Sequence, residues 1–158
     1  MKGIAFLSGF ISALVTLGMT LPASCEVLSD GTTNTTVSPI GNNFNILNGI
    51  QKGNNLFHSF KEFSIPTGGS ATFNNSTDVV NIINRVTGGN ISDIDGLIKA
   101  NGSANLFLIN PAGIMFGENA RLDIGGSFLG STAESILFAD GFEFSAVNTS
   151  ETPLLTIS

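Results

Sequence analysis

The residues of this sequence that could carry acid–base or metal chemistry are few and scattered. His58 is the only histidine among 158 residues, so no histidine metal cluster or paired imidazole can form. In the segment Leu-Phe-His-Ser-Phe at residues 56–60 it alternates with apolar residues, which predicts a position facing solvent or a cap. No activated nucleophile lies near it in the sequence, so the pattern does not indicate a catalytic base.

The acidic residues suggest two other kinds of site, a calcium-binding turn and a pair of catalytic carboxylates. Residues 88–93 followed by Asp95 have the look of a calcium-binding Gly-Gly-x-Gly-x-Asp repeat, but Ile91 replaces a required glycine and the unit does not recur. Polysaccharide cleavage needs clustered carboxylates and a base. Arg85 and Arg121 could each act as a base or clamp, but the acids are scattered: Asp78, Asp93, Asp95, Glu118, Asp123, Glu134, Asp140 and Glu143. We predict no cofactor, no metal and no enzyme, with a polysaccharide-cleaving enzyme as the less favoured alternative.

The charge balance argues against nucleic-acid binding. Six basic residues against twelve acidic residues give a formal net charge of −6, so the cations that neutralise phosphates are missing. Only 11% of the residues are charged, below the usual share of about 25%, and 42% are hydrophobic. A chain of this length and composition can bury one modest core, which predicts a single packed domain.

The N-terminus has the pattern of a secretory signal peptide, which we place at residues 1–25. Lys2 precedes an apolar run over residues 4–21, and the cleavage region after it contains small residues: Ala23, Ser24 and Cys25. Ser, Thr and Gly interrupt the run, which falls short of the roughly 20 apolar residues of a spanning helix, so no stable membrane span is expected. Cys25 is the only cysteine, which excludes a disulfide within the mature chain. Lipidation of Cys25 stays an alternative, although Pro22 stands where lipoprotein signals usually carry leucine.

Short apolar clusters recur along the chain at a nearly constant spacing. Nineteen glycines, thirteen phenylalanines and abundant Asn, Ser and Thr favour strands separated by tight turns over long helices. Successive cluster centres lie seven to nine residues apart: Ile82, Ile91, Ile98, Phe107, Ile114, Leu122, Leu129 and Leu137. Three such strand-and-turn units make a coil of roughly 24 residues, within the range of solenoid repeats.

We therefore expect an all-β solenoid, a parallel β-helix, over residues 42–158. Glycine and asparagine would form its corners, and aliphatic ladders would fill its interior. Residues 26–41 are too polar to own a core and are expected to form an N-terminal cap or a frayed first strand. In residues 105–110 four apolar residues run together, as in a strand covered on both faces. An antiparallel sandwich is the competing architecture.

Four blocks of sequence carry a family resemblance: residues 55–63, 83–98, 105–114 and 125–133. In order and spacing they resemble the haemagglutination-activity, or two-partner secretion, domain of filamentous-haemagglutinin-like exoproteins, over roughly residues 37–147. The resemblance implies a right-handed single-stranded parallel β-helix that directs secretion of an adhesin-like exoprotein. It also implies recognition by the POTRA domains of an Omp85-type outer-membrane barrel transporter. The expected location is secreted or at the cell surface, reached through the periplasm of a Gram-negative-type bacterium.

The candidate site comes from that resemblance: Asn110, Pro111, Ala112, Gly113 and Ile114 stand where the family shows an Asn-Pro-x-Gly-Ile motif linked to secretion. Pro111 fixes φ and lacks an N–H, and Gly113 can take a positive φ, so the residues themselves predict a tight turn between two buried strands. Turning the corner in register and contacting the transporter are both consistent with this turn. The family's second Asn-Pro motif is not matched, because residues 88–91 read Gly-Gly-Asn-Ile.

Two further expectations concern surfaces. Asn, Ser and Thr on the coil faces could bind host or matrix glycans, so a glycan- or surface-binding module is the main alternative function. Residues 153–158 look like the start of another strand, and members of the family usually continue into a long passenger. We therefore expect a chain truncated at its C-terminus, with a split reading frame and a short stand-alone member of the family as the alternatives. An uncapped last coil would leave strand edges free, which predicts self-association.

Overall fold

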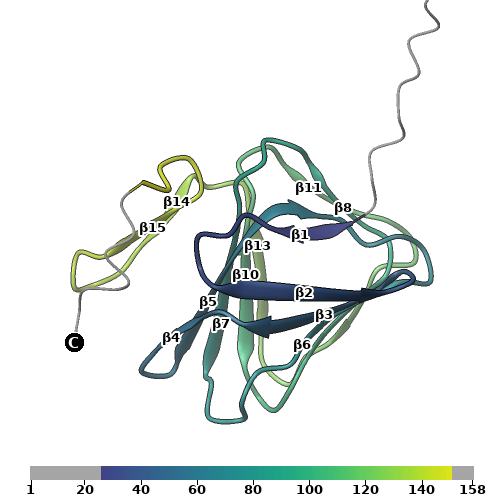
Figure 1. Cartoon of the computed structure of the whole chain (residues 1–158), viewed down its shortest axis with the longest axis horizontal. Coiled ribbons are helices and arrows are strands. Elements are labelled where there is room, and N and C mark those ends of the chain that lie inside the picture. The colour runs from purple at the N-terminus through teal and green to yellow at the C-terminus, as the bar shows by residue number, and fades with distance from the viewer. Residues whose placement is uncertain (1–25, 151–158) are drawn as a thin grey trace, which may run out of the picture.

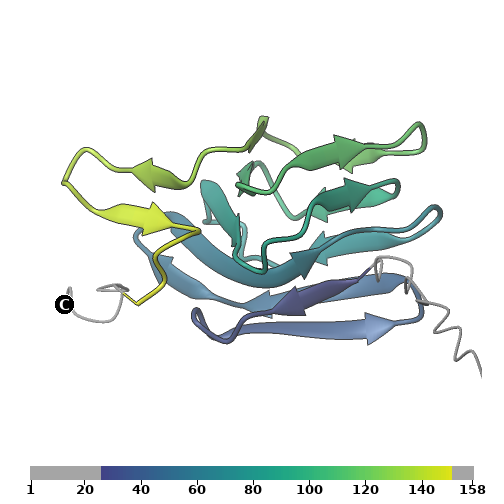
Figure 2. The same cartoon turned by 90° about the horizontal axis from the view of Figure 1, so that it is seen from above.

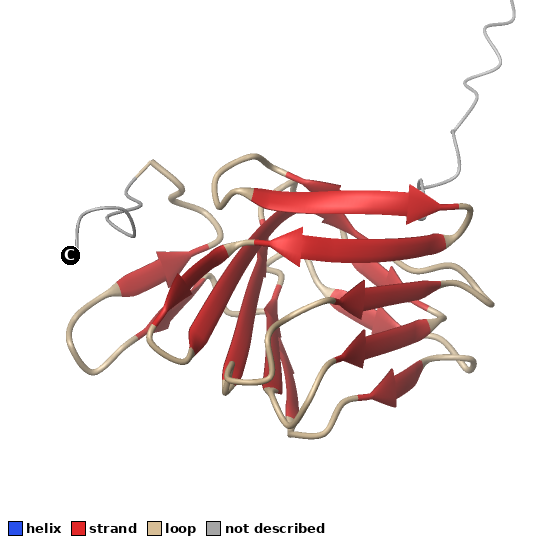
Figure 3. Cartoon of the chain, turned by 60° about the horizontal axis from the view of Figure 1, so that its bottom comes forward, coloured by secondary structure: helices blue, strands red, loops and turns tan. Residues whose placement is uncertain are grey.

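The computed structural model describes residues 26–150, which form strands connected by turns. Over this range there are fifteen strands and no helix. Figure 3 shows the strands joined by loops and turns. Accordingly, the described part of the chain holds no helix of the length and apolar character needed to cross a membrane. The signal peptide predicted for residues 1–25, including its cleavage region, lies outside the described residues, and so do residues 153–158.

Most strands belong to three parallel sheets that form the sides of a β-solenoid (Figure 1). The first side stacks four strands: β5 (Asn55–Phe63), β7 (Asn81–Val86), β10 (Asn105–Ile109) and β13 (Phe128–Ser131). The second side also stacks four: β3 (Asn43–Asn48), β6 (Ser70–Phe73), β9 (Leu97–Ala100) and β12 (Arg121–Asp123). The third side holds two: β8 (Ser92–Ile94) and β11 (Ile114–Phe116). Parallel stacking on all three sides confirms the predicted β-helix and rules out the antiparallel sandwich.

The coils shorten along the solenoid and bracket the predicted length of roughly 24 residues. On the first side, Asn55 and Asn81 pair at a separation of 26 residues, and Leu106 and Phe128 pair at a separation of 22. Asn81 pairs with Asn105 on the first side, and Leu97 pairs with Arg121 on the second, in both cases 24 residues further along the chain. The apolar spacing of the sequence therefore measured the solenoid repeat correctly.

Equivalent side chains stack in ladders along the solenoid axis. Inside, Ile82 and Leu106 are in register and fully buried, as the sequence predicted for aliphatic residues. At the start of the first side, Nδ2 of Asn81 donates to Oδ1 of Asn55 (2.9 Å), and Nδ2 of Asn105 donates to Oδ1 of Asn81 (3.0 Å). The aliphatic ladder buries apolar area while the asparagine ladder pairs polar groups, so both kinds of residue hold the coils together.

The N-terminal end of the solenoid is closed by strands that run against its direction. β1 (Val27–Ser29) pairs antiparallel with β5, and β2 (Thr35–Ile40) pairs antiparallel with β3. A third short strand, β4 (Ile50–Lys52), is also antiparallel to β5. Behind them Ile46 of β3 is 1% exposed, so the interior of the first coil is covered. Pro39 in β2 lacks an N–H, which disfavours addition of a further strand at this end.

After β13 the chain leaves the solenoid and forms an antiparallel hairpin of β14 (Ser135–Leu137) and β15 (Glu143–Ser145). The hairpin lies beside the stack of coils, as Figure 2 shows. The prediction that the cluster near Leu137 continues the repeat is therefore wrong. Aromatic residues of the hairpin cover the outer face of the first side, where the rings of Phe57 and Phe144 lie 5.1 Å apart. This second apolar cluster confirms that β10 is covered on both faces.

Candidate functional site

The chain turns from the first to the third side of the solenoid at residues 110–114, between β10 and β11. The N–H of Gly113 donates to the carbonyl oxygen of Asn110 (3.0 Å), which closes the expected tight turn. The side-chain oxygen of Asn110 accepts a second hydrogen bond, from the N–H of Ala112 (3.0 Å). Gly113 has a φ of 128°, a conformation that residues with a Cβ rarely adopt. The local sequence thus accounts for the shape of this corner.

Asn110 ties the corner to the coil beneath it. Its side chain is fully buried, and Nδ2 donates to the carbonyl oxygen of Asn90 (2.9 Å) and to Oγ of Ser92 (3.0 Å). In return, the N–H of Ser92 donates to the carbonyl oxygen of Gly113 (3.0 Å). Both donors and the oxygen of the Asn110 amide are therefore used within the protein. The geometry makes Asn110 the residue that holds the corner in register.

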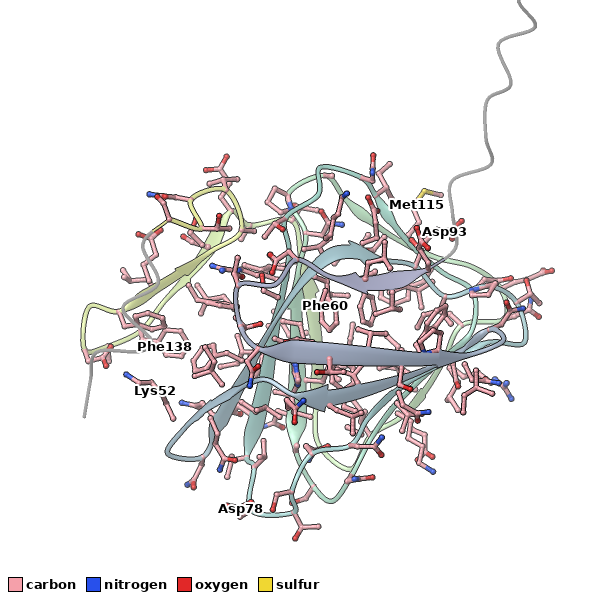
Figure 4. The ribbon with its side chains drawn as sticks, in the orientation of Figure 1. Lys52, Phe60, Asp78, Asp93, Met115 and Phe138 are labelled. Atoms are coloured by element: carbon pink, nitrogen blue, oxygen red, sulfur yellow. The ribbon has the colours of Figure 1, made fainter. Side chains whose placement is uncertain are left out.

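The exposed part of the corner is apolar. Ala112 is exposed and Pro111 is partly exposed. Beside them, Ile91 of the coil beneath and Met115 in the middle of β11 are 49% and 60% exposed. Met115 is in register with Asp93, and Figure 4 shows the two side chains together at the margin of the molecule. We call Ile91, Ala112 and Met115 the apolar rim of the corner. Apolar surface bordered by a carboxylate suits contact with a protein partner better than it suits catalysis.

The coil beneath forms its own corner at residues 88–91, where the family's second motif is not matched. A Cβ at position 88 would lie 2.0 Å from the carbonyl oxygen of Lys61, so only glycine allows this close approach to the preceding coil. Nδ2 of Asn90 donates to Oε1 of Glu62 (2.5 Å), which, like Lys61, belongs to the preceding coil. This corner is therefore shaped by close backbone packing.

Arg85 is the largest fully buried side chain in the described range, and it joins three parts of the fold. Its Nε donates to Oγ of Ser59 in β5 (2.7 Å), and its Nη2 donates to Oγ1 of Thr32, before β2 (3.0 Å). Its Nη1 donates to the carbonyl oxygen of Ser145 in β15 (2.6 Å). The guanidinium also lies over the ring of Phe144, 4.4 Å from its centroid. One side chain thus connects the N-terminal cap, the first side and the C-terminal hairpin.

Asp30 supplies the negative charge of this network. Its Oδ2 accepts hydrogen bonds from the hydroxyls of Ser59 (2.6 Å) and Thr87 (2.8 Å). Burial raises the pKa of the Asp30 carboxyl, but hydrogen bonds from Ser59, Thr32 and Thr87 outweigh it and hold the pKa below its ordinary value. Burial lowers the pKa of the Arg85 guanidinium, and the Asp30 charge offsets part of that effect. Because Arg85 is buried and bonded on every nitrogen, it is not placed to act as a base or clamp on a substrate.

His58 lies inside the solenoid with 1% of its surface exposed, so its predicted position at solvent or a cap is wrong. On a strand, residues two apart point the same way, and His58 therefore points inward with Leu56 and Phe60. Its Nδ1 shares a hydrogen bond with Oγ1 of Thr35 (2.9 Å), and its ring stacks on Phe60 with centroids 6.0 Å apart. Burial lowers the pKa of His58 to about 3. It is a neutral core residue.

The carboxylates considered above do not gather into a site. Within residues 26–150 no group of three or more His, Cys, Asp or Glu side chains is arranged to hold a metal ion. Asp95 instead joins neighbouring turns, because its carboxylate accepts from the hydroxyl of Thr67 and from the N–H of Asn119 (2.9 Å). These hydrogen bonds lower the pKa of Asp95, and the bond from the Thr67 hydroxyl has the largest effect. Asp95 is therefore a partly exposed residue that links turns of neighbouring coils.

Comparison with known proteins identifies the family of this chain. The TPS (two-partner secretion) secretion domain family matches residues 25–158. The chain belongs to this family. The TPS secretion domain of this chain is also similar to a crystal structure of the HMW1 secretion domain from Haemophilus influenzae, with a TM-score of 0.51 and 28% identity over 73% of this chain. It spans 28% of the length of that HMW1 chain. No curated protein matches the sequence.

Membership of this family indicates the general role of the chain. The chain carries a secretion-directing domain of a two-partner exoprotein, and such a domain implies a partner transporter of the same secretion system. TPS secretion domains belong to exported proteins of Gram-negative bacteria. The family is one of secretion domains and is not a known class of enzymes.

Proposed function

We propose that this TPS secretion domain is recognised by the periplasmic POTRA domains of an Omp85-type outer-membrane transporter, and that the corner at residues 110–114 belongs to the contact surface. The observation that supports this is the division of the corner into two parts. Asn110 is buried and satisfied, whereas the apolar rim is exposed. A residue that only turns the chain needs no apolar neighbours at the surface, and exposed apolar patches commonly mark contact sites.

Export would proceed in the order in which the chain emerges. The chain crosses the inner membrane unfolded, and its strands offer their edges to the transporter's POTRA domains by β-augmentation. The turn at residues 110–113 is closed by hydrogen bonds within its own four residues, so it can form and meet the POTRA domains before the coils stack. Coils then stack one on another as they leave the barrel, so the free energy of stacking is gained on the outer side. The product is the N-terminal part of an adhesin-like exoprotein at the cell surface.

The test separates contact from turn formation by comparing variants of the rim with a variant of the buried amide. Met115→Glu and Ala112→Glu place a charge on the rim, and we expect each to weaken binding of purified POTRA domains and secretion at least tenfold, the loss that about 1.4 kcal/mol produces. Their urea midpoints should stay close to that of the unmodified chain. The matched control is Val80→Glu, because Val80 is 46% exposed at another corner.

Two outcomes would overturn this assignment. One is the absence of POTRA binding at micromolar concentration. The other is equal secretion by Met115→Glu and Val80→Glu chains, combined with a secretion defect in Asn110→Ala that follows its loss of stability. In that second case the motif serves the turn alone.

A further inference from the structure

The hairpin of β14 and β15, residues 134–146, is held against the solenoid by side chains. Within residues 26–150 its two strands pair only with each other. The hairpin also closes its own base, because the N–H of Ala146 donates to the carbonyl oxygen of Glu134 (2.8 Å). Figures 1 and 2 both show it to one side of the stacked coils. The hairpin can therefore separate from the solenoid without breaking any pairing between solenoid strands.

The face that the hairpin covers is apolar. Phe57 and Ile83 are in register on the outer face of the first side, and they are 2% and 3% exposed. Three rings of the hairpin lie with their centroids 5.1 to 5.9 Å from that of Phe57: Phe138, Phe142 and Phe144. Burial of this apolar area favours the closed arrangement, and separation of the hairpin would expose it.

A charged side chain, Arg85, lies on the same covered face. The hairpin gives it the carbonyl oxygen of Ser145 and the ring of Phe144, neither of which carries a charge. Closing the hairpin removes the guanidinium from water, and burying a charge is costly unless the charge is paired and hydrogen-bonded. Closure therefore depends on a negative charge supplied from elsewhere in the chain.

The N-terminal cap supplies that charge through two hydroxyl groups. Nε of Arg85 donates to Oγ of Ser59, which in turn donates to Oδ2 of Asp30 (2.6 Å). Nη2 of Arg85 donates to Oγ1 of Thr32, which in turn donates to Oδ1 of Asp30 (2.8 Å). Each carboxylate oxygen is thus connected to the guanidinium through one hydroxyl. Asp30 and Thr32 lie in the turn between β1 and β2, so the charge is in place only when the cap is folded.

We propose that the hairpin is a strap whose closing depends on the N-terminal cap, and that Arg85 couples the two. With the cap in place the guanidinium is paired, and the hairpin closes over it. With the cap displaced, closing would bury an unpaired charge, so the hairpin opens and exposes the apolar face around Phe57 and Ile83. The proposal does not rest on the transporter contact at residues 110–114.

The first test measures native-state hydrogen exchange of the processed chain. Asp30→Asn removes the charge but keeps the shape of the side chain, and it should speed exchange of residues 134–146 at least about tenfold. Leu97 and Leu106, whose N–H groups bond to neighbouring coils, should change by less than about twofold. Thr36→Val is the control, because it removes a hydrogen-bonded hydroxyl of the cap that has no part in the Arg85 network.

The second test runs in the opposite direction, because coupling between two equilibria is reciprocal. Phe142→Asp places a charge in the apolar cluster and should leave the strap open, and residues 27–33 of the cap should then exchange about tenfold faster. The matched control is Leu137→Asp, since Leu137 is 73% exposed in the same hairpin. In an Arg85→Met chain, Phe142→Asp should no longer affect the cap.

Three results would overturn the proposal. The first is unchanged exchange of residues 134–146 in Asp30→Asn, because the strap would then close without the charge of the cap. The second is an effect of the cap on the strap with no effect of the strap on the cap. The third is equally faster exchange in every strand of Asp30→Asn, which would mean that the cap supports the whole fold and not the strap in particular.

Discussion

Acidification from pH 7.5 to pH 5.0 is expected to destabilise this domain through one residue, His58. The imidazole is buried and its pKa is about 3 in the folded state, against about 6.5 in the unfolded chain. Below pH 6.5 the unfolded chain therefore binds a proton that the folded chain does not. The free energy of unfolding is at its full value above pH 6.5 and falls as the pH drops toward 3.

The size of the effect follows from these two pKa values. At pH 5.0 the unfolded state gains about 1.5 pH units of protonation free energy, or about 2 kcal/mol at 1.36 kcal/mol per unit. Since pH 5.0 is well above the folded pKa, the result depends mainly on the unfolded value. Asp30 contributes little in this window, because its folded pKa lies below 3.8.

Urea denaturation at the two pH values measures the loss, with chain lacking a histidine tag. His58→Gln keeps a polar group beside Thr35 and should remove most of the pH dependence, because His58 is the only histidine. Equal stability of the unmodified chain at both pH values would refute the reasoning. An equal loss in His58→Gln would refute it as well.

Two substitutions probe the packing of the coils. Arg85→Met should lower the free energy of unfolding by about 3 kcal/mol, because three charge-assisted hydrogen bonds are lost, and hydrogen exchange should show faster opening of residues 134–146. Lys61→Met removes an exposed charge and should change stability by less than about 0.5 kcal/mol. Gly88→Ala should cost about 2 kcal/mol or more in urea denaturation, because its Cβ meets a backbone oxygen at 2.0 Å. Gly89→Ala should cost only about 1 kcal/mol, since it has a positive φ but open space, and equal losses at the two glycines would contradict the clash.

The solenoid could be predicted because apolar residues recur at the positions that point into its interior. Each coil needs apolar residues at the buried positions that Ile82, Ile98 and Leu106 occupy. The spacing of such residues along the sequence therefore gives the number of residues in one coil. The tight turn at residues 110–114 could also be predicted, because proline fixes φ and glycine tolerates a positive φ. Both signals are local and do not depend on what packs outside the coil.

The hairpin was missed because its apolar residues repeat at the same interval as those of the solenoid. Phe138 and Phe142 pack on the outer face of the first side, which the sequence alone does not distinguish from a further coil. A local signal was nevertheless present. Asp140-Gly141 lies between the two phenylalanines, and an Asp-Gly pair flanked by apolar residues is a strong hairpin signal. Gly141 indeed has a φ of 85°, and the N–H of Phe138 donates to the carbonyl oxygen of Phe142 (2.8 Å).

The position of His58 was predicted wrongly, and the burial of Arg85 was not predicted, for a related reason. Because β5 and β7 are covered on both faces, alternation of polar and apolar residues no longer separates inside from outside. His58 shares its direction with Leu56 and Phe60, which already argued for the interior. Arg85 points outward, but the hairpin buries it, and its partners Thr32 and Ser145 lie 53 and 60 residues away. A local sequence pattern cannot indicate contacts between residues that lie so far apart in the sequence.

The asparagine ladder has a consequence for how such a domain can change in length. The Asn81 amide donates to Asn55 of the coil below and accepts from Asn105 of the coil above, so an inserted coil that begins with asparagine at this place would find an acceptor below and a donor above. Growth or shrinkage by whole turns of about 24 residues would preserve these bonds. A one-residue insertion would instead break the ladder and reverse the direction of every later side chain in its strand. Duplications in this gene should therefore be tolerated in units of complete coils.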